Sequence, residues 1–120
     1  MKKILIVEDE MIIADMHQDI VEAGGNEVVG IAATSREAVR LFEKHSPDII
    51  LMDIYLADET DGIETMEKIR ESSQVPVIYV TGNSEEQTRK RAEKTGYAAY
   101  LKKPVEPDIL TAAIKHVFEN

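Results

Sequence analysis

Three acidic side chains stand where apolar segments of the chain end. Glu8 and Asp9 directly follow a short apolar run at residues 4–7, and Asp53 directly follows another at residues 49–52. Carboxylates held close together raise one another's pKa and destabilise a fold unless a cation neutralises them. A hard divalent cation such as Mg²⁺ (or Mn²⁺) does so, and it needs only one or two carboxylates besides water and phosphate oxygens. The acids therefore predict a metal site, although Glu8 or Asp9 could instead cap a following helix.

A hydroxyl group and an amine follow two further apolar runs. Thr81 comes after the run at residues 75–80, and the pair Lys102 and Lys103 comes after the run at residues 98–101. Side chains alternate along an extended segment, so only one of the two lysines can face the same site as Thr81. A hydroxyl group, an ammonium group and a hard cation together suit a phosphoryl group. The predicted chemistry is therefore the binding or transfer of a phosphoryl group.

The elements that must position these residues alternate along the chain. Short apolar runs without polar alternation predict strands buried on both faces, as in a parallel sheet covered by helices. Segments with a period near 3.6 residues separate these runs and predict helices. The strands are predicted at residues 4–7, 28–33, 49–52, 75–80 and 98–101. The apolar stripes of the helices are Ile13, Met16 and Ile20; Ala38, Leu41 and Phe42; Ile63, Met66 and Ile69; and Leu110, Ile114 and Val117.

This alternation predicts a doubly wound α/β fold of the form (βα)5 with right-handed crossovers. In such a sheet, ligands bind at the carboxyl ends of the strands, where the strand order reverses. All the candidate residues therefore fall at one edge of the sheet. The length of 120 residues is typical of one domain, so we expect a single domain over residues 1–120.

One helical segment has almost no apolar residues. The segment at residues 84–95 reads SEEQTRKRAEKT, with Ser84 as the expected N-cap and Ala92 as its only clearly apolar residue. It is interpreted either as a solvated surface helix or as a weakly anchored helix that can shift, and the two interpretations are compatible. The second interpretation offers four basic side chains to a partner, namely Arg89, Lys90, Arg91 and Lys94.

The composition excludes several classes of function. The chain has 14 Lys and Arg against 23 Asp and Glu, a net charge of −9, so we expect no direct nucleic-acid binding. It has no cysteine, which excludes disulfides, thiolate metal sites and cysteine nucleophiles. No apolar run approaches the roughly 20 residues of a membrane helix, and we expect no membrane insertion and a cytoplasmic location. Three histidines in no metal-site spacing are expected at the surface, namely His17, His45 and His116.

Four sequence segments carry a resemblance to a known family. ILIVEDE, PDIILMDIYL, VPVIYVTGN and AAYLKKPV resemble the receiver domain of two-component response regulators, in order, at the family's spacing and over the whole chain. Each motif alone is common, whereas their combination is specific. The resemblance implies a flavodoxin-like fold with a five-stranded parallel sheet in the strand order 2-1-3-4-5. It implies a domain that takes a phosphoryl group from a histidine kinase or phosphotransfer protein.

The resemblance also implies a role for each candidate residue. Asp53 matches the phosphoacceptor, and Glu8 and Asp9 match the acidic pair that holds Mg²⁺ together with Asp53. The other implied roles are the main-chain carbonyl of Tyr55 as a metal ligand, Thr81 and Lys103 as phosphoryl-binding residues, Thr81 and Tyr100 as switch residues, and Pro104 as a cis-proline. Such a domain catalyses its own phosphorylation and dephosphorylation rather than the turnover of a separate substrate. Phosphorylation would switch the face from Ser84 to Asn120, for self-association or for a downstream partner.

Two positions depart from the family's pattern. The first acid of the pair is Glu8 where the family often has Asp, which leaves open whether it binds the metal directly or through water. The loop after Asp53 holds Ala57 where the family commonly has Pro. Among the acids of this loop, Asp58 is expected in solvent and Asp61 is expected to cap the next helix.

Other functions are weighed against a phosphorylated receiver. An aspartate-nucleophile phosphatase needs a second Asp two positions after its nucleophile on the first strand, whereas Asp9 is followed by Glu10 and Met11. The phosphate-binding loop GxxxxGK[ST] and the dinucleotide motif GxGxxG are absent from the sequence. The alternative that stays open is a phosphorylation-independent protein-interaction domain on the receiver fold.

Overall fold

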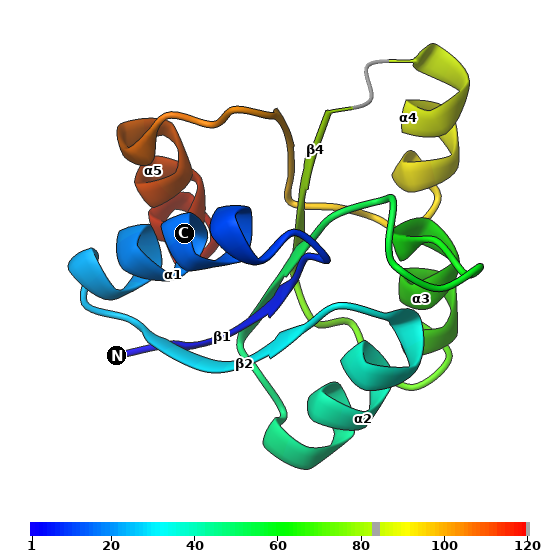
Figure 1. The fold of residues 1–120 in the computed structure, drawn as a ribbon, viewed down its shortest axis with the longest axis horizontal. Helices are drawn as coiled ribbons and strands as arrows, with labels where there is room; N and C mark the ends of the chain where they lie inside the picture. The colour runs from blue at the N-terminus through cyan, green and yellow to red at the C-terminus, as the bar shows by residue number, and fades with distance from the viewer. Residues whose placement is uncertain (83–84, 120) are drawn as a thin grey trace.

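Five parallel strands form the sheet at the centre of the molecule (Figure 1). The computed structural model describes residues 1–82 and 85–119, so the expected N-cap Ser84 lies outside the described residues. The sheet has the order β2-β1-β3-β4-β5, which confirms the predicted flavodoxin-like order 2-1-3-4-5. Every strand lies within two residues of its prediction: β1 (Lys3–Val7), β2 (Glu27–Ala32), β3 (Ile49–Met52), β4 (Val77–Thr81) and β5 (Ala99–Lys102).

The helices cover both faces of this sheet. Helices α1 (Met11–Ala23) and α5 (Pro107–Val117) lie on one face (Figure 1). Helices α2 (Ser35–His45), α3 (Gly62–Ile69) and α4 (Glu86–Glu93) lie on the other. Among residues 1–82 and 85–119, none of these helices has the length and apolarity of a membrane span.

The strands are held between two apolar layers because successive side chains point to opposite faces. Leu5 of β1 and Ile50 of β3 pack toward α2 and α3, whereas Ile4 and Ile49 pack toward α1 and α5. All four side chains are fully buried, and each such burial contributes roughly 1.5–3 kcal/mol. This two-sided burial explains why the strands read as continuous apolar runs.

Side-chain caps begin helices α2 and α3 next to the sheet's carboxyl edge. The Thr34 hydroxyl accepts a hydrogen bond from the Glu37 main-chain NH at 3.1 Å and starts α2. Asp61 and Glu64 form a reciprocal capping box at the start of α3, with hydrogen bonds of 2.8 and 3.0 Å. The expected cap at Asp61 is confirmed. These caps fix where the loops that follow β2 and β3 end.

The buried face of α1 differs from the predicted stripe. Ala14, His17 and Val21 are buried, whereas Met16 is 51% exposed. Apolar residues follow one another at the start of this helix, so the phase of the stripe was ambiguous, and the sheet contacts the neighbouring side. The expectation of a surface position for His17 is therefore wrong. Burial, and then the charge of Lys103, lower the pKa of His17, which keeps its imidazole neutral at neutral pH.

Candidate functional site

The strands extend by one residue at the carboxyl edge of the sheet and thereby position the candidate side chains. Glu8, Asp53 and Lys103 donate their main-chain NH groups to the last residues of β2, β1 and β4, at 2.8, 2.9 and 2.9 Å. Each of the three residues is thus held by the backbone of a neighbouring strand. Their side chains leave the sheet at the same edge, as the doubly wound arrangement predicts.

Lys103 joins two buried carboxylates. Its Nζ lies 2.6 Å from Glu8 Oε1 and 3.1 Å from Asp53 Oδ2. The three side chains are mostly buried, with exposed fractions of 15% for Lys103, 2% for Glu8 and 7% for Asp53. The other carboxylate oxygens accept main-chain hydrogen bonds, Asp53 Oδ1 from Ile54 at 2.8 Å and Glu8 Oε2 from Glu10 at 3.1 Å. The site is therefore a desolvated cluster with two acids and one ammonium group.

Burial and charge shift the pKa values of this cluster. Burial raises the pKa of Glu8 to about 7, and the hydrogen bond from Lys103 opposes that rise. Burial alone lowers the pKa of Lys103, but its hydrogen bonds and the charges of Glu8 and Asp53 outweigh this effect and raise it. Lys103 is therefore charged at neutral pH, whereas Glu8 titrates near neutrality.

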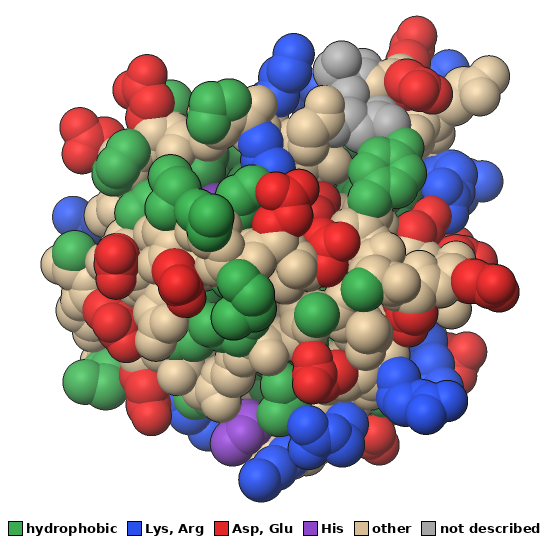
Figure 2. Space-filling model, viewed as in Figure 1, with side chains coloured by type: hydrophobic (Ala, Val, Ile, Leu, Met, Phe, Trp, Pro, Cys, Tyr) green, Lys and Arg blue, Asp and Glu red, His purple; other side chains and the backbone are tan. Residues whose placement is uncertain are grey.

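A set of three consecutive acids lies at the start of α1. Carboxylate oxygens of Glu8, Asp9 and Glu10 lie within 4.8 Å of one another among the described residues. Figure 2 shows acidic side chains together in the middle of the viewed face, over the turn between β1 and α1. Asp53 lies outside this set and is linked to it through Lys103. Glu10 is the N-cap residue of α1 but makes no side-chain capping bond, and it was not among the metal ligands expected from the sequence. The signal in the sequence that could have included Glu10 was the run of three consecutive acids.

The other candidate residues surround this cluster. Thr81 is fully buried at the end of β4, and its main-chain oxygen accepts the hydrogen bond from Lys103. Tyr55 lies in the loop after β3 and its side chain is 57% exposed. The Lys103–Pro104 peptide bond is cis. Lys102 is exposed, so the two adjacent lysines do face different environments.

Tyr100 lies in an aromatic cluster at the edge of the sheet. Its ring centroid is 5.9 Å from that of Tyr79 on β4 and 5.5 Å from that of Tyr97. The Arg89 guanidinium of α4 lies 5.4 Å from the Tyr100 ring and donates a hydrogen bond to the Tyr97 hydroxyl at 3.2 Å. Tyr100 therefore contacts α4 through a basic side chain.

The loop after β3 is bound to the neighbouring loop after β2. Asp58 accepts hydrogen bonds from the Ser35 main-chain NH at 3.0 and 3.2 Å. The Ala57 main-chain NH donates to the Ala33 carbonyl at 3.0 Å. The expectation that Asp58 is free in solvent is therefore wrong, because the first NH groups of α2 lack partners within the helix and attract a carboxylate.

Comparison with protein families identifies the class to which this fold and site belong. The model of the response regulator receiver domain matches residues 4–115. The chain therefore belongs to the response regulator receiver domain family, as the sequence resemblance implies, and this family functions in two-component signalling.

Curated relatives and solved structures agree with this family. The chain is 38% identical to the phyllosphere-induced regulator PhyR of Methylorubrum extorquens, over 93% of this chain and 42% of the relative. It is 34% identical to the transcriptional regulatory protein PdtaR of Mycobacterium tuberculosis, over 95% of this chain and 55% of the relative. The chain thus spans about half the length of these relatives. A CheY-like receiver domain from Methanospirillum hungatei superposes with a TM-score of 0.90 at 35% identity, covering 98% of this chain and 93% of that one.

Proposed function

We propose that this chain is a phosphoacceptor receiver domain in which Asp53 takes a phosphoryl group from a phosphohistidine. The observation that carries this proposal is the buried contact of Lys103 Nζ with Asp53 Oδ2 at 3.1 Å, at the carboxyl edge of the sheet. A carboxylate nucleophile needs its surroundings to neutralise the charge of the incoming group. Lys103 supplies one such charge from within the site.

The transfer forms an acyl phosphate on Asp53. A carboxylate oxygen of Asp53 attacks the phosphorus atom, and the oxygen–phosphorus bond forms as the phosphorus–nitrogen bond to the donor histidine breaks. The donor imidazole leaves with the electron pair and takes up a proton. Lys103 then binds an oxygen of the phosphoryl group, and the Thr81 hydroxyl donates to another. Attack by water on the phosphorus atom then breaks the bond to the Asp53 oxygen, releases inorganic phosphate and restores the Asp53 carboxylate.

The acids at the start of α1 suit a divalent cation. Glu8, Asp9 and Glu10 offer carboxylate oxygens within 4.8 Å of one another, and oxygen is the ligand that Mg²⁺ and Mn²⁺ prefer. Glu8, Asp9, Asp53 and the Tyr55 main-chain carbonyl would hold the cation. When bound, it would supply positive charge to the phosphoryl oxygens. A solved relative supports this assignment, the CheX–CheY–BeF3–Mg²⁺ complex from Borrelia burgdorferi, with a TM-score of 0.92 at 25% identity.

The surface around the site supports a protein as the phosphodonor. Elements that begin at the carboxyl edge of the sheet, namely α1, the loop after β3 and α5, carry five large apolar side chains that are at least half exposed: Met11, Ile12, Met16, Tyr55 and Ile109. Exposed apolar side chains rimmed by polar residues are typical of protein-interaction surfaces. The donor would accordingly be a histidine kinase or a phosphotransfer protein.

Phosphorylation with a small donor tests the proposal without a cognate kinase. The purified chain is incubated with Mg²⁺ and phosphoramidate, and its intact mass is measured. We expect a gain of one phosphoryl group that Asp53→Asn abolishes. Asp19→Asn, which changes an exposed acid of α1, is the matched control and should retain the gain.

Two outcomes would contradict the proposal. Unchanged labelling of Asp53→Asn would place the phosphoryl group elsewhere. No labelling of the unsubstituted chain by phosphoramidate, combined with no binding of beryllofluoride, would instead favour the phosphorylation-independent interaction domain.

A further inference from the structure

Helix α4 has little apolar anchorage, and its carboxyl end is fixed by polar contacts. Only Thr88 and Ala92 are buried in this helix. The Thr95 hydroxyl just after it lies 2.8 Å from the Tyr79 hydroxyl, and Arg70 Nε donates to the Thr95 carbonyl at 2.7 Å. Thr95 is only 4% exposed. The helix is therefore held firmly at its end, and its body must be positioned by other contacts.

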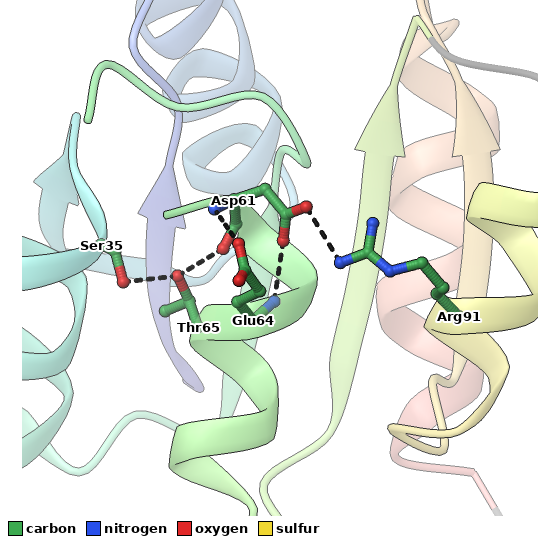
Figure 3. A network of polar contacts seen from close by, with 5 residues as sticks. All are labelled: Ser35, Asp61, Glu64, Thr65 and Arg91. Carbon is green, nitrogen blue, oxygen red and sulfur yellow. Dashed lines mark hydrogen bonds and ion pairs between the residues drawn. The ribbon is translucent and has the colours of Figure 1, made fainter. Parts of the chain in front are cut away.

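An ion pair connects the body of α4 to Asp61, the N-cap residue of α3. Arg91 reaches across from α4, and its Nη2 binds Asp61 Oδ2 at 3.0 Å (Figure 3). The other oxygen of Asp61 accepts the capping hydrogen bond from the Glu64 main-chain NH at 2.8 Å. The hydrogen bond to Asp61 raises the pKa of Arg91. The Asp61 carboxylate is therefore fixed on both oxygens, one within α3 and one by α4.

The first turn of α3 is packed directly against the backbone of Asp53. The Gly62 main-chain NH donates to the Ile54 carbonyl at 2.7 Å. A Cβ at Gly62 would overlap the main-chain oxygen of Asp53 and lie 2.9 Å from Met52 Cγ. Because Asp61 directly precedes Gly62, a displacement of Asp61 would also shift the contact between Gly62 and the backbone of Asp53. A short physical connection runs from Asp53 through this turn to Arg91.

We propose that the ion pair between Arg91 and Asp61 is a latch that holds α4 in the unphosphorylated arrangement. The inference rests on the proposed function of Asp53. The pair is formed in the arrangement in which Lys103 contacts the carboxylates of Glu8 and Asp53 directly, and a movement of α4 away from α3 lengthens the pair. A displacement of α4 away from α3 on phosphorylation would therefore break or weaken this contact. Because coupling between two sites is reciprocal, loss of the latch strengthens phosphoryl binding at Asp53.

The size of this effect follows from the exposure of the pair. The exposed fractions of the two side chains are 46% for Arg91 and 22% for Asp61. Partly exposed pairs of this kind are weak, so opening the latch should raise the affinity for a phosphoryl analogue by about 1.5- to 5-fold. An effect of this size shifts the equilibrium between the two arrangements of α4 but does not populate one of them exclusively.

Titration with beryllofluoride in the presence of Mg²⁺ tests the latch. Calorimetry gives the affinity of the unsubstituted chain, of Arg91→Ala, of Asp61→Asn and of the double variant. Asparagine still caps a helix, so Asp61→Asn removes the charge and keeps the start of α3. Lys90→Ala is the matched control, since Lys90 also carries an exposed charge on α4 but pairs within the helix, with Glu86 at 3.8 Å.

We expect each single variant to bind beryllofluoride about 1.5- to 5-fold more tightly and the double variant no more tightly than either one. The amides of α4 should also exchange hydrogen faster in both single variants before any ligand is added. Lys90→Ala should change neither quantity. Equal or weaker binding by Arg91→Ala, or additive effects in the double variant, would overturn the latch. No binding by the unsubstituted chain would instead count against the proposed function itself.

Discussion

Replacing Lys103 by Met removes the only ammonium group in direct contact with Glu8 and Asp53 among the described residues. The two carboxylates are at most 7% exposed, so water cannot take over the lost contacts. Breaking a buried ion pair by removing one partner costs about 3–5 kcal/mol. We expect Lys103→Met to lower the free energy of unfolding by about this amount at pH 8.

The cost should shrink as the pH falls. The pKa of Glu8 is raised from 4.5 to about 7 in the folded protein, so the folded state binds the proton more tightly than the unfolded state. Stability from this group therefore increases as the pH drops from 7 toward 4.5, by at most about 3 kcal/mol. Loss of the Lys103 hydrogen bond raises the pKa of Glu8 further. At pH 5, Glu8 is then neutral in the folded variant, and the remaining cost is that of the bond to Asp53, about 1.5–3 kcal/mol.

Urea unfolding at pH 5 and pH 8, with a chelator present, measures how much Lys103→Met lowers the free energy of unfolding at each pH. Lys102→Met is the matched control, because Lys102 is the adjacent and exposed lysine. It should change the free energy of unfolding by less than about 0.5 kcal/mol at either pH. A cost for Lys103→Met that equals the control, or that is larger at pH 5 than at pH 8, would refute this account of the buried cluster.

Three other substitutions test how the structure positions the site. Gly62→Ala should destabilise the fold by about 1–3 kcal/mol, because the added Cβ overlaps the Asp53 backbone. Gly24→Ala is the control, since its Cβ meets no atom closer than 3.5 Å, and thermal melts compare the two variants. Asp61→Ala should cost about 1 kcal/mol more than Asp61→Asn in urea unfolding, since only Asn keeps the cap of α3. Arg70→Leu should cost about 2 kcal/mol, because the guanidinium donates to three carbonyls between 2.7 and 3.3 Å, and equal stability of this variant would contradict that role.

The sheet could be predicted from sequence because its strands are buried on both faces. Each strand is then a continuous apolar run, and the polar residue after the run marks the edge of the sheet. This reasoning placed Glu8, Asp53 and the pair Lys102 and Lys103 at one edge, whereas the choice of Lys103 from the pair came from the family resemblance. The face of α1 could not be predicted in the same way. Met11, Ile12 and Ile13 are consecutive, so periodicity did not distinguish the buried side from the exposed one.

The contacts within the site were only partly predictable. Reasoning from sequence directs Lys103 to the phosphoryl site at Asp53, whereas the shorter of its two contacts is to Glu8, at 2.6 Å rather than 3.1 Å. A residue's position at a strand end specifies the edge but not which of two nearby carboxylates its side chain prefers. The longer side chain of Glu8 reaches the lysine, which an Asp at that position would do less well. The hydrogen bonds from the Ser35 NH at the start of α2 to Asp58 could not be predicted either, because a loop residue has no hydrophobic period that indicates its partner.

Tertiary contacts change the role assigned to the basic side chains of α4. The sequence offers Arg89, Lys90, Arg91 and Lys94 alike to a partner, but in the structure two of them contact residues outside α4. Arg89 binds the tyrosines next to β5, and Arg91 binds Asp61. The polar contacts thus provide the anchorage that apolar residues do not. If the latch opens on phosphorylation, the Arg91 charge is released onto the surface of a protein with a net charge of −9. The switched face would then differ in charge as well as in shape.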